Sequence, residues 1–175
     1  MRIIALLVAV LTLGSASVLV PVASAADMPA RGGAVSASPA ALVAARLDPE
    51  AALARINALR TERGLKALAL DPALSSAAQR HAEDLATLQD AVHIGSDGGD
   101  PFDRVAAAGF DAVTVGENVS AGQRGQDEAI DGWIESPAHL ATILAPSVTH
   151  FGVALAYDPT TRFRTYWTMV VAEPF

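Results

Sequence analysis

The spacing of apolar and polar residues predicts a run of helices and strands from Asp48 onward. Helix starts are indicated at Asp48-Pro49 and Asp71-Pro72, because Asp caps the first N–H groups of a helix and Pro fits its first position. After Asp71-Pro72, apolar residues return every three or four positions as far as Leu88, and His81 lies on that apolar face. The predicted helices cover residues 49–63, 72–88, 102–108, 127–133 and 137–144, and the predicted strands cover 111–119, 151–157 and 165–173.

The order of these elements predicts an α+β fold. Helices come early and strands late, with further helices between them, which favours an antiparallel sheet covered by helices over a parallel βαβ sheet. We expect His81 to be a packed or hydrogen-bonded histidine. Trp133 lies on the apolar side of an otherwise polar helix and Trp167 lies in a closing strand, so both are expected to be buried structural residues.

The first 25 residues are typical of a secretory signal peptide. Arg2 precedes a long apolar run, and Ala23-Ser24-Ala25 is a small-x-small cleavage pattern. An uncleaved N-terminal anchor is the alternative, since the apolar run approaches the roughly 20 residues that span a bilayer. Residues 26–47 are rich in Ala, Ser, Gly and Pro and are predicted to form a flexible linker before a single domain at 48–175. We therefore expect a secreted or periplasmic protein with no membrane span once the signal peptide is removed.

Composition narrows the classes of molecule that the protein is expected to bind. The net charge is −7 and Lys66 is the only lysine, so nucleic acid and anionic membrane surfaces are disfavoured as partners. The chain has no cysteine, so the domain folds on its core alone or with help from a metal. A monomer that takes a small-molecule, lipid or peptide ligand is the expectation.

Several common catalytic signatures are absent from the sequence. His81 and Glu83 begin like a zinc-protease helix, but Leu85 stands where HExxH requires its second histidine, and no GxSxG motif is present. In contrast, Glu117 of GENVSAG falls in a predicted strand, where a carboxylate needs a partner. His93 and His139 are chemically suitable partners, although spacing alone does not connect them to Glu117.

Six segments carry a resemblance to a known family: INALRTERGLKALALDPALSSAAQRHAEDL, VHIGSDG, DRVAAAGF, VGENVSAG, DGWIESPAHLATIL, and FGVALAY with YWTMVVAE. In order and spacing they resemble the CAP superfamily of cysteine-rich secretory, antigen-five and pathogenesis-related proteins, and its cysteine-free bacterial branch in particular. The resemblance covers residues 48–175. It implies an α-β-α sandwich with a central antiparallel sheet and an open cleft.

The resemblance also implies which residues line that cleft. The two motif histidines of the family correspond to His93 and His139, and the Glu of its GEN motif corresponds to Glu117. Ser136 stands where many eukaryotic members carry a second Glu, and we place it in the cleft with the other three. In some members the histidines bind a divalent metal, so His93, His139 and Glu117 are expected to be able to hold Zn²⁺.

Three functions remain open from the sequence. The first is a binding module whose cleft holds a lipid, a peptide or another envelope component, with any metal as an accessory. The second is a metal-dependent hydrolase or peptidase in which Glu117 is the catalytic general base and the histidines are metal ligands. The third is a structural interaction module of the cell envelope. Whether the cleft is catalytic stays open, because function resides in the site and not in the fold.

Overall fold

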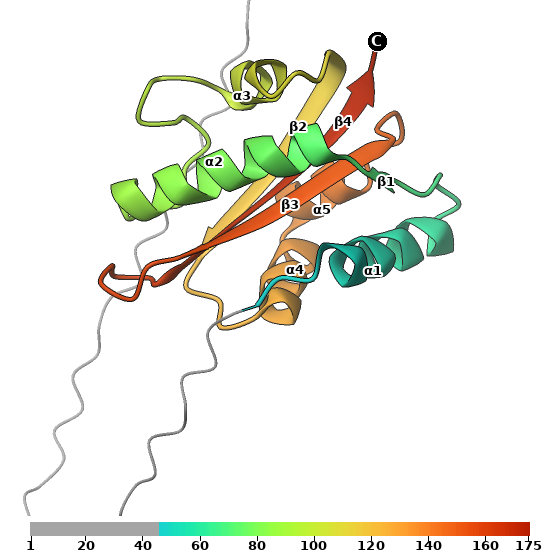
Figure 1. Cartoon of the computed structure of the whole chain (residues 1–175). Helices are drawn as coiled ribbons and strands as arrows, with labels where there is room; N and C mark the ends of the chain where they lie inside the picture. Colours follow the sequence, from blue (N-terminus) through green and yellow to red (C-terminus); the bar gives the residue numbers. More distant parts are fainter. Residues whose placement is uncertain (1–45) are drawn as a thin grey trace, which may run out of the picture. The chain divides into compact units, whose positions relative to one another are not determined.

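The computed structural model describes residues 46–175 (Figure 1), and the predicted signal peptide and nearly all of the predicted linker lie outside these residues. All five predicted helices and all three predicted strands are present, and one short strand is added. In chain order the elements are α1 (Pro49–Glu62), β1 (Ala69–Leu70), α2 (Pro72–Leu88), α3 (Pro101–Ala107), β2 (Ala112–Ala121), α4 (Gln126–Glu135), α5 (Pro137–Ile143), β3 (His150–Tyr157) and β4 (Thr165–Pro174).

The described sheet has four strands in the order β1-β3-β4-β2. β4 is antiparallel to both β3 and β2, as predicted, whereas the two residues of β1 pair parallel with the start of β3. The sheet is therefore mixed, and the α+β fold class is confirmed. The parallel strand was not predicted because two residues are too few to show an alternating pattern.

Helices cover both faces of this sheet, which gives the expected α-β-α sandwich. α2 crosses one face, with α3 at its side, while α1, α4 and α5 lie on the other (Figure 1). Each face buries its own hydrophobic core, one beneath α2 and one beneath α1, α4 and α5. Trp133 and Trp167 belong to the second core and are 2% and 1% exposed, so their predicted burial is confirmed.

α2 lies unusually close to the sheet because β3 carries Gly152 beneath it. A β-carbon at Gly152 would lie 2.3 Å from the carbonyl carbon of Leu74 and 2.4 Å from the backbone nitrogen of Ser75. Only glycine fits at this crossing, and the backbone of α2 consequently packs directly on the strand.

A fully buried arginine, Arg60, lies on the inner side of α1 and stabilises the layer formed by α1, α4 and α5. Its guanidinium donates to four backbone carbonyls: Lys66 at 2.9 Å, Ile143 at 2.7 Å, Ala145 at 2.9 Å and Val148 at 3.2 Å. Burial lowers the pKa of Arg60. The side chain thus ties α1 to the segment that leaves α5.

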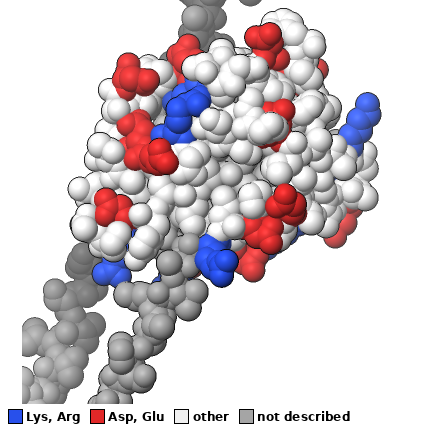
Figure 2. Space-filling view, in the orientation of Figure 1, with Lys and Arg blue, Asp and Glu red and all other residues white. Residues whose placement is uncertain are grey.

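The surface agrees with the acidic composition. On the face drawn in Figure 2, blue Lys and Arg side chains lie apart from one another among red carboxylates, so this face offers no broad basic patch. Within residues 46–175, none of the helices combines the length and the apolar character needed to cross a bilayer.

Candidate functional site

Glu117 is a buried carboxylate in β2, the strand at one edge of the sheet. In the pairing of β2 with β4 it stands opposite Val170, which belongs to the core beneath α2. Side chains of directly paired residues leave the sheet on the same face. Glu117 therefore points toward the layer of α2 and α3.

Three side chains surround the carboxylate and, with it, form what we call the Glu117 cluster. Nδ1 of His93, in the loop between α2 and α3, lies 2.9 Å from Oε1. Nη2 of Arg104, in α3, donates to Oε2 at 2.7 Å. Nε2 of His81, in α2, lies 3.6 Å from Oε1. Both oxygens of Glu117 therefore face positively polarised groups, which meets the need of a buried charge for partners.

The proton position on His81 follows from its other neighbour. Nε2 lies 2.8 Å from the backbone carbonyl of Val92, which can only accept, so this nitrogen carries the proton. Burial lowers the pKa of His81, which favours the neutral ring. Its Nδ1 is then an acceptor, and this atom is buried without a hydrogen-bond partner among residues 46–175.

His93 is oriented in the opposite sense. A carboxylate oxygen only accepts, so Nδ1 of His93 carries the proton that faces Glu117. In the neutral ring the free lone pair is then on Nε2. Because the side chain is 52% exposed, His93 can offer this nitrogen to a ligand from solution.

Arg104 joins the loop to the carboxylate. Its Nη1 donates to the carbonyl of Gly99 at 2.9 Å, and its Nη2 donates to the carbonyl of His93 at 2.9 Å as well as to Glu117. The helix that carries it begins with a capping box between Asp100 and Asp103. One guanidinium thus fixes the loop, His93 and the charge of Glu117 together.

His139 approaches from the other layer. Asn118, which follows Glu117, pairs with Met169 of the second core and so faces α5, where its Nδ2 donates to the backbone carbonyl of His139 at 3.0 Å. Burial and then the nearby charge of His93 lower the pKa of His139, so the two imidazoles lie within electrostatic reach of each other. The two histidines therefore reach the site from opposite sides of the edge strand.

The structure brings the predicted residues together to different degrees. His93 and Glu117 are in direct contact, and His139 lies near His93. Ser136 is the N-cap residue of α5, and its side chain makes no capping hydrogen bond. No hydrogen bond joins Ser136 to the Glu117 cluster within the described part of the chain.

Two members of the cluster, His81 and Arg104, were not identified as site residues from sequence. His81 is packed and hydrogen-bonded as expected, but it also approaches Glu117. Arg104 was overlooked because only imidazoles were considered as partners of the carboxylate. The available clue was physical: an Arg guanidinium pairs with a buried carboxylate more strongly than a neutral imidazole does.

The predicted metal ligands can be tested against these contacts. A catalytic zinc normally takes three protein ligands, and no group of three His, Asp or Glu side chains in residues 46–175 is arranged to hold a metal ion. Oε1 of Glu117 faces His93, and Oε2 is bound by Arg104. Both oxygens of Glu117 thus already have protein partners, the two imidazoles remain as nitrogen donors, and Zn²⁺ binding by His93, His139 and Glu117 stays a prediction.

A pocket of about 360 Å³ adjoins the cluster between α2 and α3, and His81 and Arg104 belong to its lining. Asp84 also lines it and accepts hydrogen bonds from the backbone N and the Oγ of Ser96, at 2.8 and 2.5 Å. Burial opposes ionisation of Asp84, but these two hydrogen bonds outweigh it and lower the pKa of the carboxyl. The pocket thus brings carboxylates and guanidinium groups close together.

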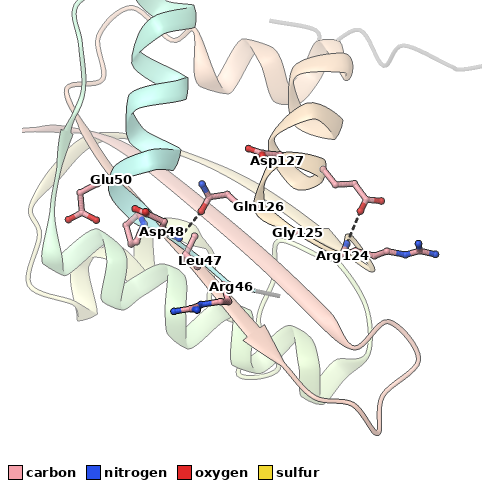
Figure 3. Close-up of a pocket in the computed structure, with 10 residues that line it drawn as sticks. Arg46, Leu47, Asp48, Glu50, Arg124, Gly125, Gln126 and Asp127 are labelled. Atoms are coloured by element: carbon pink, nitrogen blue, oxygen red, sulfur yellow. Dashed lines mark hydrogen bonds between the residues drawn. The ribbon is translucent and has the colours of Figure 1, made fainter. Parts of the chain in front are cut away.

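A wider pocket, of about 890 Å³, lies at the starts of α1 and α4 (Figure 3). There the backbone N–H of Asp48 donates to Oε1 of Gln126 at 2.8 Å, which joins the two helix starts. Its lining, all within the described residues, includes no histidine. The polar groups of this pocket join the starts of two helices, so the Glu117 cluster remains the candidate site.

Comparison with known proteins gives consistent matches. The model of the cysteine-rich secretory protein family (CAP) matches residues 53–171. Protein YkwD of Bacillus subtilis is 36% identical over 97 residues, which are 55% of this chain and 38% of that protein. The membrane protein YlbC of the same organism is 28% identical over 99 residues, 57% of this chain and 29% of that protein. The chain thus spans well under half the length of these relatives.

Solved structures share the fold. An extracellular protein of Bacillus anthracis that contains an SCP domain has a TM-score of 0.64 at 23% identity, over 71% of this chain and 40% of that chain. An outer surface protein of Borrelia burgdorferi has a TM-score of 0.64 at 16% identity, over 72% of this chain and 92% of that chain.

Proposed function

Because this chain belongs to the cysteine-rich secretory protein (CAP) family, we propose that it is an exported binding module whose Glu117 cluster holds a small ligand. The ligand is a lipid, a peptide or another component of the cell envelope. The export half of the proposal is supported by relatives described as an extracellular protein and an outer surface protein. It also agrees with the signal-peptide pattern of the first 25 residues.

The observation that carries the binding half is the orientation of His93. Glu117 engages Nδ1 at 2.9 Å, while the ring stays 52% exposed. The protein thereby holds one face of the imidazole and leaves Nε2 as an oriented acceptor at the surface. A polar group held in a fixed orientation at the surface is what a small-molecule site needs to orient its ligand.

An exposed apolar side chain beside this polar group supports a ligand of mixed character. Ile94 follows His93 directly and is 54% exposed. Exposed apolar groups next to hydrogen-bonding groups suit a molecule with a polar head and an apolar part, such as a lipid or a peptide with an apolar side chain.

The same contacts weigh against the hydrolase alternative in its predicted form. A general base must have an oxygen free to take a proton from water. The oxygens of Glu117 already face His93, His81 and Arg104. Binding without turnover is therefore the better supported function.

The proposal can be tested by following imidazole signals in two-dimensional NMR spectra of the purified protein. Two probes are added separately: dihexanoyl-phosphatidylglycerol below its critical micelle concentration, and a short peptide of alternating alanine and leucine. We expect one of them to shift the signals of His93 and His139 in a saturable manner, and mass spectrometry of the same samples to find the probe intact.

A matched pair of variants separates site binding from surface adsorption. His93→Ala removes the exposed imidazole of the cluster, whereas His150→Gln changes a histidine at the start of β3 that stacks edge-on against Phe110. Binding should be lost in the first variant and kept in the second. Equal binding in both, or no saturable shift with either probe, would contradict the proposal, and a cleaved probe would favour the hydrolase.

A further inference from the structure

We propose that Arg104 is the built-in cation of this site: its guanidinium occupies the position at Glu117 that a divalent metal would take, so the cleft binds its ligand without a metal. The proposal rests on the proposed function, since it concerns the same cleft. It assigns a specificity-determining role to a residue that the family resemblance did not single out.

The first step is the local charge. Glu117 and Arg104 lie 2.7 Å apart, and their side chains are 2% and 11% exposed. At this burial, water screens the pair only weakly, so the guanidinium neutralises the carboxylate almost completely. A metal ion at Glu117 would find the carboxylate charge already neutralised, and it would be repelled by the guanidinium of Arg104.

The second step is that Arg104 is not free to move aside. It spans three partners, the carbonyls of Gly99 and His93 and the carboxylate of Glu117. Moving the side chain away would leave a buried carboxylate without its countercharge and two carbonyls without their hydrogen-bond donor, which is strongly unfavourable. Nη2 alone holds both Glu117 and the backbone of His93, so moving it would also loosen the exposed histidine.

The third step concerns the chemistry that remains. With Glu117 neutralised, the solvent-facing part of the site is the ring of His93, which is 52% exposed and has its Nδ1 engaged by Glu117, so that Nε2 is left for a ligand. Neutral imidazole nitrogens accept hydrogen bonds from hydroxyl and amide groups. The ligand group that meets His93 is accordingly an uncharged hydroxyl or amide, and no metal is needed to bridge it.

The experiment titrates Zn²⁺ alone into the purified protein by isothermal calorimetry at pH 7.5. It compares wild type, Arg104→Met, Arg104→Lys, Glu117→Gln, and the double variant that combines Arg104→Met with Glu117→Gln. Methionine keeps much of the apolar stem and removes the charge, whereas lysine keeps the charge but lacks the planar guanidinium with its several N–H donors. We expect Arg104→Met to bind zinc at least about tenfold more tightly than wild type, Arg104→Lys to stay near wild type, and the double variant to lose the gain.

Two outcomes would overturn the proposal. One is a zinc affinity that is unchanged or lower in Arg104→Met. The other is a wild-type affinity that already depends on Glu117, seen as a tenfold or greater loss in Glu117→Gln alone. Circular dichroism checks that each variant is folded before it is titrated.

A measurement on wild type keeps the proposal falsifiable if the variants do not fold. The Nδ1–H signal of His93 reports its hydrogen bond to Glu117. It should persist when zinc is added in excess, because any zinc then sits on imidazole Nε2 atoms alone, and its disappearance would mean that zinc has drawn Glu117 to itself. None of these titrations uses a lipid or peptide probe, so their failure is separate from a failure of the proposed binding function.

Discussion

Glu117 and Asn118 are neighbours in β2 and hold the two histidines of the site from opposite faces of the sheet. Glu117 contacts the ring of His93 at 2.9 Å on the α2 side, and Asn118 donates to the backbone of His139 at 3.0 Å on the α5 side. The alternation of side chains along a strand makes this possible. Two consecutive residues at a sheet edge thereby position groups from both helical layers.

Glu117 is expected to matter for stability as well as for ligand binding. Glu117→Gln would leave the guanidinium of Arg104 buried without its countercharge, so the free energy of unfolding should fall by about 3 kcal/mol. Urea denaturation followed by circular dichroism measures this. His93→Ala is the matched comparison and should lower stability by less than about 1 kcal/mol, because its side chain is 52% exposed. Similar losses in both variants would argue that Glu117 and Arg104 do not form a buried pair.

The buried imidazole of His81 predicts an acid-sensitive fold. Burial lowers its pKa below the ordinary 6.5, so as pH falls the unfolded chain takes up this proton before the folded protein does. Stability from this group is therefore full above pH 6.5 and decreases as pH drops below that value. The lowered pKa of His139 acts in the same direction, whereas Asp84, with an ordinary value of 3.8, acts only at lower pH.

Melting temperatures measured between pH 7.5 and pH 5.0 check this prediction. Wild type should lose stability steadily toward pH 5.0. His81→Gln keeps a donor for the carbonyl of Val92 but does not titrate, so its melting temperature should depend less on pH. An unchanged slope in that variant would assign the acid sensitivity to other groups.

Gly152 gives a prediction about packing. In Gly152→Ala the new methyl group would lie 2.3 Å from the backbone of Leu74, and backbone cannot move away as a side-chain tip can. The loss should reach about 3 kcal/mol, the upper end for overpacked sites. Gly132→Ala in α4 is the control, since nothing lies within 4 Å of the added carbon, and it should stabilise the protein by about 0.5–1 kcal/mol. Thermal denaturation of the two variants should move in opposite directions.

Arg60 gives a prediction about the opposite layer. Arg60→Met keeps the apolar stem but leaves four backbone carbonyls, two of them in buried hydrogen bonds, without their donor, so stability should fall by about 3 kcal/mol. Arg63→Ala removes the exposed C-cap arginine of the same helix, which donates to the carbonyl of Leu59 and lies 3.9 Å from the carboxylate of Glu62. It should change stability by less than about 0.5 kcal/mol. Chemical denaturation distinguishes them, and a mild effect of Arg60→Met would mean that water replaces the guanidinium.

Local signals in the sequence were sufficient to predict the helices. Asp48 and Asp71 accept hydrogen bonds from the first-turn N–H groups, as their position before proline predicted. The α+β class followed from the order of the elements. β1 could not be predicted, because its pairing depends on a parallel contact with β3, about 80 residues away, and not on a local pattern.

The site was predictable only in part for a similar reason. The unusual placement of Glu117 in a strand pointed to a partner, and family motifs pointed to His93. Arg104 becomes its partner only when α3 folds against β2, a contact that no periodicity in the sequence reports. Arg60 was overlooked in the same way, since the local sequence does not show that its guanidinium meets four backbone carbonyls in the folded protein.

The strand order has a consequence for how the chain folds during its synthesis. β4 is the last strand in sequence, yet it lies between β3 and β2 in the sheet. Until residues 165–174 have left the ribosome, β2 and β3 have no strand between them to pair with, and the sheet cannot form. Such late, long-range pairing slows folding. The sheet therefore closes only after the last strand of the chain has been synthesised, and an unpaired β2 and β3 must wait for it.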